Sequence, residues 1–232
     1  MLQSQLPIAN KLLAALPRGE YQRLAEHLET VELVEGEVLS EPGEPMRYVY
    51  FPATALLSLL TLVDGSDVFA VGLVGREGMT SVACALGSQV SPFRTLVQCS
   101  GQAVRMKTKS FIKEFRESAT LRDMILQYVL SLTTLIAQTA ACNRYHVIEE
   151  RLARWLLMTR DRLSSDHFHM THEMLGYLMG VRRVGVTNAA HALKERNLID
   201  YSRGAIDIVD GPGLQAAACS CYRMVEGRHG RS

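Results

Sequence analysis

Residues 172–193 read HEMLGYLMGVRRVGVTNAAHAL, and the glycines in this stretch mark two short helices joined by a tight turn. With His172 as the first position, Gly176 is the fifth, where two helices approach so closely that only a small residue fits. Gly180 is the ninth and falls in the turn, where glycine adopts a positive φ without steric cost. The pattern predicts a helix-turn-helix whose apolar residues pack its two helices together: Leu175, Leu178, Val181 and Val186.

The second of these helices presents a basic surface that lacks acidic residues. No Asp or Glu occurs from Met174 to Lys194. A cationic surface of this kind suits the phosphate-lined groove of a nucleic-acid duplex. Six side chains are expected to face outward: Arg182, Arg183, Val184, Thr187, Asn188 and His191.

A hairpin and a capped helix follow the helix-turn-helix. Residues 200–210 read DYSRGAIDIVD, and Ser202-Arg203-Gly204 separates two short runs that predict paired strands, or a wing. Asp210 is placed to cap a final helix, with Pro212 in its first turn. A helix-turn-helix followed directly by a wing is far more specific than either feature alone.

Residues 31–106 have the pattern of an antiparallel barrel or sandwich. Turn signals recur every few residues, and Asp64-Gly65 between two apolar runs is the sharpest hairpin signal. Short runs rich in β-branched and aromatic residues lie between the turns, which is typical of such folds. The predicted strands are Val31–Val34, Tyr48–Phe51, Leu56–Val63, Val68–Val74, Thr95–Gln98 and Ala103–Met106.

Helices are predicted on both sides of this region. The segment from Asn10 to His27 is expected to form two short pieces, because Asn10 is a suitable N-cap and Pro17 interrupts the segment. Residues 109–117 are predicted as a short helix and residues 149–163 as an amphipathic one.

The longest predicted helix covers about residues 121–143. From Met124 to Cys142 it carries no charged residue, which indicates burial on most sides. We interpret it as a dimerisation helix, covered on one side by its own barrel and on the other by a second chain; the alternative is a core helix of one domain. The expected dimer interface follows a heptad seam: Ile125, Tyr128, Leu132, Leu135, Thr139 and Cys142.

With these features in this order, the chain resembles the Crp/Fnr family of bacterial regulators, most strongly over residues 170–209. The resemblance implies an α+β fold, with an antiparallel β jelly-roll barrel of the cyclic-nucleotide-binding type, a long dimerisation helix and a C-terminal winged helix-turn-helix. Residues 143–145 mark the hinge, so the sensor domain is expected at residues 1–145 and the DNA-binding domain at residues 146–232. The resemblance also implies a homodimer that regulates transcription, binds palindromic operators in double-stranded DNA and contacts RNA polymerase.

The resemblance assigns roles to residues of the helix-turn-helix and wing. Arg183 takes a base-reading position, and arginine can pair bidentately with guanine O6 and N7. Asn188 takes a second such position. Val184 lies where the family often has a glutamate that reads cytosine, so the operator is expected to differ, with apolar contact to a thymine methyl group. Phosphate contacts are expected from Thr171, His172, Arg182, Ser202 and Arg203, and Thr187 and His191 complete the expected interface.

The sensor end departs from the cyclic-nucleotide binders of the family. Those proteins hold the phosphate with an arginine followed by serine or threonine, and the ribose with a glycine-glutamate pair. Here Glu77 precedes its glycine, and Arg94-Thr95 is the candidate effector-binding pair, although in a shifted register. Ordinary cyclic-AMP binding is therefore not expected and no cofactor is predicted, while a cyclic-nucleotide-responsive regulator stays an alternative.

Cysteine positions argue against an iron–sulfur sensor, because the first cysteine is Cys84 and the N-terminal ligand cluster is missing. A haem sensor and a redox role for Cys84, Cys99 or Cys142 are left open. Cys219 and Cys221 are expected on different faces of the last helix, one in the core and one at the surface, where they would form a poor chelate.

No metal site is predicted. The spacing of His167, His169 and His172 resembles that of metal ligands, but no cysteine or carboxylate completes an obvious set.

Composition fits a globular chain of one large or two small domains, with 47% hydrophobic and 21% charged residues. The net charge of +1 carries no argument about nucleic acid. Residues 1–16 lack the features of a signal peptide, and no stretch is expected to reach the ~18 apolar residues of a membrane span. Five scattered cysteines suit reduced thiols. We therefore expect a cytoplasmic protein with no membrane partner.

Two other functions are alternatives to that of a transcription regulator. A metal-dependent jelly-roll enzyme needs histidines on its barrel strands, and residues 31–106 contain none, so no enzymatic activity is expected. A sensor or scaffold protein whose helix-turn-helix serves protein contacts stays an alternative.

Overall fold

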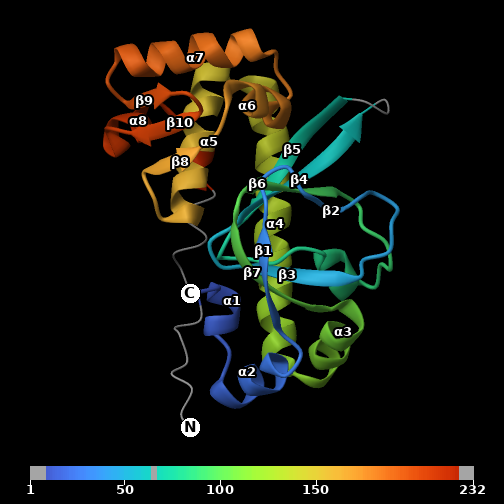
Figure 1. Ribbon diagram of the computed structural model, residues 1–232. Helices are drawn as coiled ribbons and strands as arrows, with labels where there is room; N and C mark the ends of the chain where they lie inside the picture. Colours follow the sequence, from blue (N-terminus) through green and yellow to red (C-terminus); the bar gives the residue numbers. More distant parts are fainter. Residues whose placement is uncertain (1–8, 64–66, 225–232) are drawn as a thin grey trace. The chain divides into compact units, whose positions relative to one another are not determined.

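The computed structural model describes residues 9–63 and 67–224 and divides into two compact units (Figure 1). One unit comprises residues 1–57 and 74–129, and the other residues 58–73 and 130–232. The boundary predicted after residue 145 therefore differs from the observed one, which falls inside the long helix. Local packing explains the difference, because a Cβ at Gly72 would lie only 3.4 Å from Leu132 Cδ1 of that helix.

Residues 29–107 form two sheets with antiparallel pairing, in agreement with the predicted antiparallel barrel or sandwich. One sheet has the order β1-β7-β3 and the other β2-β6-β4-β5. In the first, Val49 lies opposite Met106 and both are buried. The strands are β1 (Glu29–Leu33), β2 (Val38–Ser40), β3 (Tyr48–Pro52), β4 (Leu56–Val63), β5 (Asp67–Val74), β6 (Arg94–Cys99) and β7 (Gly101–Lys107).

All six predicted strands are present, and β2 is an addition. It escaped prediction because three residues are too few to show an alternating pattern. The predicted hairpin turn at Asp64-Gly65 lies outside the described residues.

A buried side chain caps α1 and links it to the rest of the first unit. Asn10 Oδ1 accepts hydrogen bonds from the N–H groups of Leu12 and Leu13, which confirms the predicted N-cap. Its Nδ2 donates to the carbonyl oxygens of Pro52 and Gly78, both at 2.9 Å. The helices of this unit before the long one are α1 (Lys11–Ala14), α2 (Arg18–Ala25), a short 3₁₀ helix (Val82–Leu86) and α3 (Thr108–Glu117).

The long helix α4 (Ala119–Tyr145) buries the predicted heptad seam within a single chain. Tyr128 donates a hydrogen bond to the carbonyl oxygen of Met79, and Thr139 accepts one from Arg154. The predicted dimer interface is therefore corrected by the structure. These side chains are buried by their own chain and leave no exposed surface for a second chain. Their exposed fractions are Ile125 0%, Tyr128 7%, Leu132 5%, Leu135 2%, Thr139 4% and Cys142 1%.

A second seam on α4 is exposed. Its residues are spaced by alternating steps of four and three, which places them on one face, roughly opposite the buried seam. None of them is charged before the last. They are Leu126, Leu130, Thr133, Ala137, Ala140 and Arg144.

By length and composition, α4 is also long and apolar enough to cross a membrane, with a mean hydropathy of 1.4 over its most apolar window. The expectation that no stretch meets this criterion is therefore wrong for α4. Only 33% of that window is buried, in agreement with the exposed second seam.

The second unit contains the predicted winged helix-turn-helix. Its small sheet has the order β8-β10-β9, in which Phe168 of the unpredicted strand β8 lies opposite Ile206. Asp210 caps the last helix by accepting from the N–H of Gly213, as predicted. The elements are α5 (Ile148–Leu163), β8 (His167–His169), α6 (His172–Met179), α7 (Arg183–Glu195), β9 (Ile199–Ser202), β10 (Ala205–Ile208) and α8 (Gly211–Ala217).

Contact between α4 and the first unit can be tested with Gly78→Ala. A Cβ at Gly78 would lie 2.2 Å from Tyr128 Oη, so the buried tyrosine must shift. We expect the free energy of unfolding to fall by about 1–3 kcal/mol, as overpacking does elsewhere. In a chain of this size each kcal/mol lowers the melting temperature by about 2–4 °C, measured by circular dichroism.

The matched control is Gly19→Ala in α2, where a new Cβ meets nothing within 4 Å. Alanine favours the helix there, so we expect an equal or slightly higher melting temperature. Equal melting temperatures for the two variants would contradict the packing described.

Candidate nucleic-acid interface

The predicted helix-turn-helix is present with its glycines in the expected roles. Gly180 ends α6 with φ 64°, in the left-handed region that favours glycine. A Cβ at Gly176 would lie 3.0 Å from the carbonyl oxygen of Val181, so the close approach predicted for the fifth position is observed. Thr171 begins the motif, since its hydroxyl oxygen accepts from the N–H of Met174 and caps α6.

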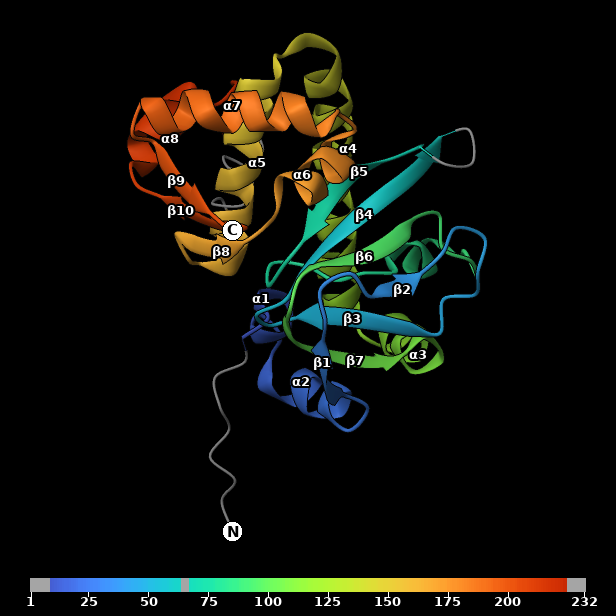
Figure 2. The ribbon, with the colours of Figure 1, turned by 45° about the horizontal axis from the view of Figure 1, so that its top comes forward.

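Helix α7 lies on the outside of the second unit with its inner face against α5 (Figure 2). The inner face is made of Val186, Ala189, Ala190 and Leu193, all buried. The six residues predicted to face outward are all exposed, and Val184 retains 62% of its surface. The prediction of an exposed second helix is thus confirmed.

Arg182 and Arg183 are the free cations of this surface. Within the described residues, neither forms an ion pair or a hydrogen bond through its side chain, although Arg183 is the first residue of α7 and Arg182 its N-cap. The other charged residues of this helix are neutralised locally. His191 lies 3.3 Å from Glu195, and Lys194 pairs with Asp200 of β9. The positive charge is therefore concentrated at the N-terminal end of α7, where the helix dipole also favours an anion.

A side-chain cluster joins the start of α6 to α7 and the wing. His172 Nδ1 lies 3.2 Å from Thr187 Oγ1, and that hydroxyl also donates to the carbonyl oxygen of Arg183 at 3.1 Å. Because the hydroxyl has one proton, His172 must donate from Nδ1. Its ring also meets the ring of Tyr201 edge-on, with 4.7 Å between the centroids. His172 and Thr187 are thus committed partly to each other, which leaves the arginines and Asn188 freer to contact a ligand.

The wing is formed as predicted. Its tip is Ser202, Arg203 and Gly204, where Arg203 has φ 49° and Gly204 φ 88°. Ser202 and Arg203 are exposed. Ser202 pairs with Ala205, and the two positive φ values between them are those of a tight two-residue hairpin turn.

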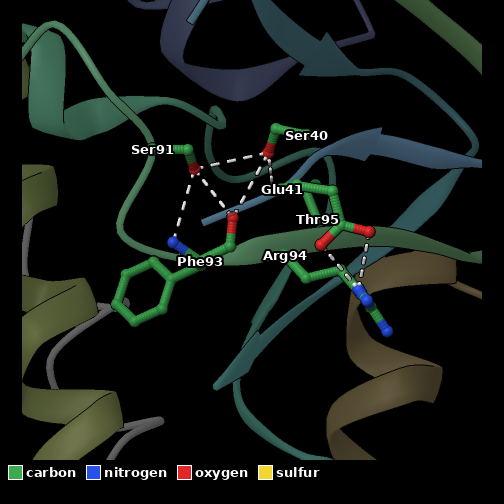
Figure 3. A network of polar contacts seen from close by, with 6 residues as sticks. All are labelled: Ser40, Glu41, Ser91, Phe93, Arg94 and Thr95. Carbon is green, nitrogen blue, oxygen red and sulfur yellow. Dashed lines mark hydrogen bonds and ion pairs between the residues drawn. The ribbon is translucent and has the colours of Figure 1, made fainter. Parts of the chain in front are cut away.

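The candidate effector pair lies in a self-contained polar network (Figure 3). Arg94 Nε donates to both carboxylate oxygens of Glu41, at 3.0 and 2.9 Å. Thr95 is 3% exposed and its hydroxyl accepts from Ser40. The structure therefore brings Arg94 and Thr95 together with groups that already satisfy them, and a cation paired with its own carboxylate is a poor site for a phosphate diester.

The two barrel cysteines are not reactive thiols. Burial raises the pKa of both Cys84 and Cys99 to about 12, so neither forms a thiolate near neutral pH.

Cys219 and Cys221 differ from the sequence analysis. Helix α8 ends at Ala217, so neither cysteine is on it, and both are buried. The interpretation as one core and one surface residue is therefore wrong. They lie close to Cys142 and His146, and the sequence analysis did not predict this group of four. The i,i+4 spacing of Cys142 and His146, which places both on one helix face, could have indicated it.

Residues 150–217 match the family model described as a Crp-like helix-turn-helix domain. No curated protein matches the chain. Among solved structures, FixK2 from Bradyrhizobium japonicum is similar over 83% of this chain and 98% of its own, with 14% identity and a TM-score of 0.70. A transcriptional regulator assigned to the Crp/Fnr family, from Eubacterium rectale, is similar over 89% and 97%, with 15% identity and a TM-score of 0.68. The c-di-GMP-responsive regulator CLP from Xanthomonas campestris is similar over 83% and 99%, with 12% identity and a TM-score of 0.67.

The fold and the exposed helix-turn-helix define a DNA-binding protein with a barrel-type N-terminal unit. The C-terminal domain belongs to the Crp-like helix-turn-helix family, and the chain as a whole has the fold of solved Crp/Fnr-type regulators.

The position of Arg183 beside the start of α6 can be tested through the titration of His172. Burial lowers the pKa of His172 below 6.5, and the positive charge of Arg183 lowers it further. A depressed pKa means that the unfolded chain binds the proton more readily. The stability that this residue contributes is therefore present above pH 6.5 and lost as the pH falls through the folded-state pKa.

We expect NMR titration of the histidine rings to show a His172 pKa that rises in Arg183→Ala. Arg182→Ala is the matched control, because Arg183 is the neighbouring charge that lowers the pKa of His172. A pKa that responds equally to both variants, or to neither, would contradict the geometry of the cluster.

Proposed function

We propose that the protein binds palindromic operators as a homodimer, with one α7 helix in each of two adjacent major grooves. In this arrangement Arg183 and Asn188 read base edges and Val184 contacts an apolar group such as a thymine methyl. Thr171, His172, Arg182, Ser202 and Arg203 contact phosphates. Thr187 and His191 lie between these two sets of contacts.

The observation that carries this proposal is the pair of arginines at the start of α7. They are exposed and have no carboxylate partner among the described residues, whereas Lys194 and His191 on the same helix are paired. Two arginines without a carboxylate partner, at an exposed helix end, fit a phosphate-rich ligand.

The exposed seam of α4 supports dimerisation. Leu126 and Leu130 are 42% and 66% exposed, and the small residues beyond them allow close approach of a second helix. We propose that two α4 helices pack in parallel through this seam, in place of the seam expected from the sequence. The same burial would cover the apolar face, so that the protein works in the cytoplasm without a membrane partner.

The regulator acts without enzymatic activity and contacts RNA polymerase when bound near a promoter. The sensor end does not use Arg94 and Thr95 for a cyclic nucleotide, since Glu41 neutralises the arginine. No cofactor takes part in DNA recognition.

Arg183→Ala tests the recognition helix. We expect affinity for an operator obtained by in vitro selection to fall roughly 10–100-fold, corresponding to about 1–3 kcal/mol, and specificity to relax at one position of each half-site. Fluorescence anisotropy with labelled duplex measures both, and wild-type affinity should fall steeply with salt.

The control is Arg116→Ala, which removes an exposed arginine at the end of α3. It should bind as the wild type does. If Arg183→Ala and wild type bind the duplex equally well, the helix-turn-helix serves another purpose, such as protein contacts.

Leu130→Glu tests the dimer interface. A charge in the middle of the exposed seam would be buried against its own symmetry mate, so we expect monomers by light scattering coupled to size exclusion. Leu86→Glu is matched in residue type and exposure, at 63% against 66%, and should remain dimeric. A dimeric Leu130→Glu would show that the chains associate elsewhere.

A further inference from the structure

Four metal-binding side chains converge inside the second unit. Cys142 and His146 come from the end of α4, and Cys219 and Cys221 from the segment after α8. Their sulfur and imidazole nitrogen atoms all lie within 4.8 Å of one another. The three cysteines are 1%, 6% and 2% exposed, so the group is shielded from solvent.

The local backbone brings each pair to one place. His146 N–H donates to the carbonyl oxygen of Cys142, so the helical turn continues past Tyr145 and the two side chains share a face. Cys219 and Cys221 flank a single turn residue that follows α8, and their sulfur atoms lie within 4.8 Å of each other. A chelate of type Cys-x₃-His with Cys-x-Cys results.

The spacing of the ligand atoms suits a tetrahedral ion. Zinc–sulfur and zinc–nitrogen bonds of about 2.3 and 2.0 Å require S···S and S···N separations of about 3.8 and 3.5 Å. Cys142 Sγ lies 3.5 Å from Cys219 Sγ, and Cys221 Sγ lies 3.6 Å from His146 Nδ1. Two of the separations thus already suit the ion, and the remaining ligand atoms, all within 4.8 Å of one another, would move closer together around it.

The surroundings of the cluster are arranged for negative charge. Arg154 of α5 is 3% exposed, and among the described residues its only side-chain partner is Thr139 Oγ1, so its Nε has none. A buried guanidinium without a carboxylate is costly unless another anion is close. Zinc bound by three thiolates and a neutral imidazole has a net charge of minus one and would supply it.

One further contact supports a thiolate at this position. Gln138, one turn before Cys142, donates from Nε2 to Cys221 Sγ at 2.9 Å, as outer-shell groups of metal sites do. Such a donor stabilises the negative charge that a metal-bound thiolate carries.

We propose that Cys142, His146, Cys219 and Cys221 form a tetrahedral zinc site that fastens the C-terminal segment to the junction of α4 and α5. Binding displaces the thiol protons of the three cysteines, and no oxidation step is involved. A disulfide between Cys142 and Cys219 would leave Cys221, His146 and the charge of Arg154 unexplained. An all-protein set of four nitrogen and sulfur ligands, without an open position, is that of a structural zinc site.

The test is the metal content of the full chain, purified without a histidine tag under reducing conditions and passed through gel filtration. We expect about one zinc per chain by plasma mass spectrometry, and none in Cys219→Ser or Cys221→Ser. Cys84→Ser and Cys99→Ser replace equally buried cysteines of the barrel and should keep the metal.

Cobalt replacement in the wild type decides the matter if the serine variants fail to fold. Co²⁺ added after chelation should give the visible absorption of a tetrahedral ion together with thiolate charge-transfer bands. The proposal would be overturned if both serine variants retained zinc, or if the wild type carried none after incubation with zinc. It would also be overturned if the wild type contained a Cys142–Cys219 disulfide or an iron chromophore in place of zinc. Metal content is measured without DNA, so this outcome is independent of the operator-binding test.

Discussion

The structure depends on how the uncharged middle of one helix, α4, covers its apolar surface. From Met124 to Cys142 this helix carries no charge, and apolar side chains occur on both of its seams, where burial away from water is favourable. One seam is buried by the chain itself, through Tyr128 against Gly78 in the first unit and through Leu132 and Thr139 in the second. The opposite seam remains for another surface, and a second copy of the same helix is the partner whose spacing matches it.

This arrangement explains which parts of the fold could be predicted. Strands, capped helices, the glycine-marked helix-turn-helix and the wing are encoded locally, by turn residues and apolar periodicity, and they appear where the sequence places them. The choice between the two seams of α4 is not local. Both follow a heptad spacing and neither carries a charge before Arg144, so only the packing of the barrel and of α5 distinguishes the buried face from the exposed one.

The same distinction applies to the functional residues. The outward face of α7 could be predicted because the apolar residues identify the buried face of the helix, and the residues on the opposite face must then be exposed. The ion pair of Arg94 could not be predicted, because its partner Glu41 is distant in sequence and lies just after a short strand that no motif marks. The cluster of Cys142, His146, Cys219 and Cys221 could not be predicted either. The spacing within each pair is visible in the sequence, but only the tertiary structure brings the two pairs together.

The position of that cluster gives it a route to the recognition helix. His146 lies in the break between α4 and α5, so a ligand held there fixes the direction in which α5 begins. The next residue but one, Ile148, packs against α7, where a Cβ at Gly185 would lie 3.0 Å from Ile148 Cδ1. Gly185 is two residues from Arg183. In the proposed zinc-bound form, a fixed α4–α5 junction would restrain the helix end that carries the two arginines through the packing of Ile148 against Gly185, without any contact between the metal ligands and DNA.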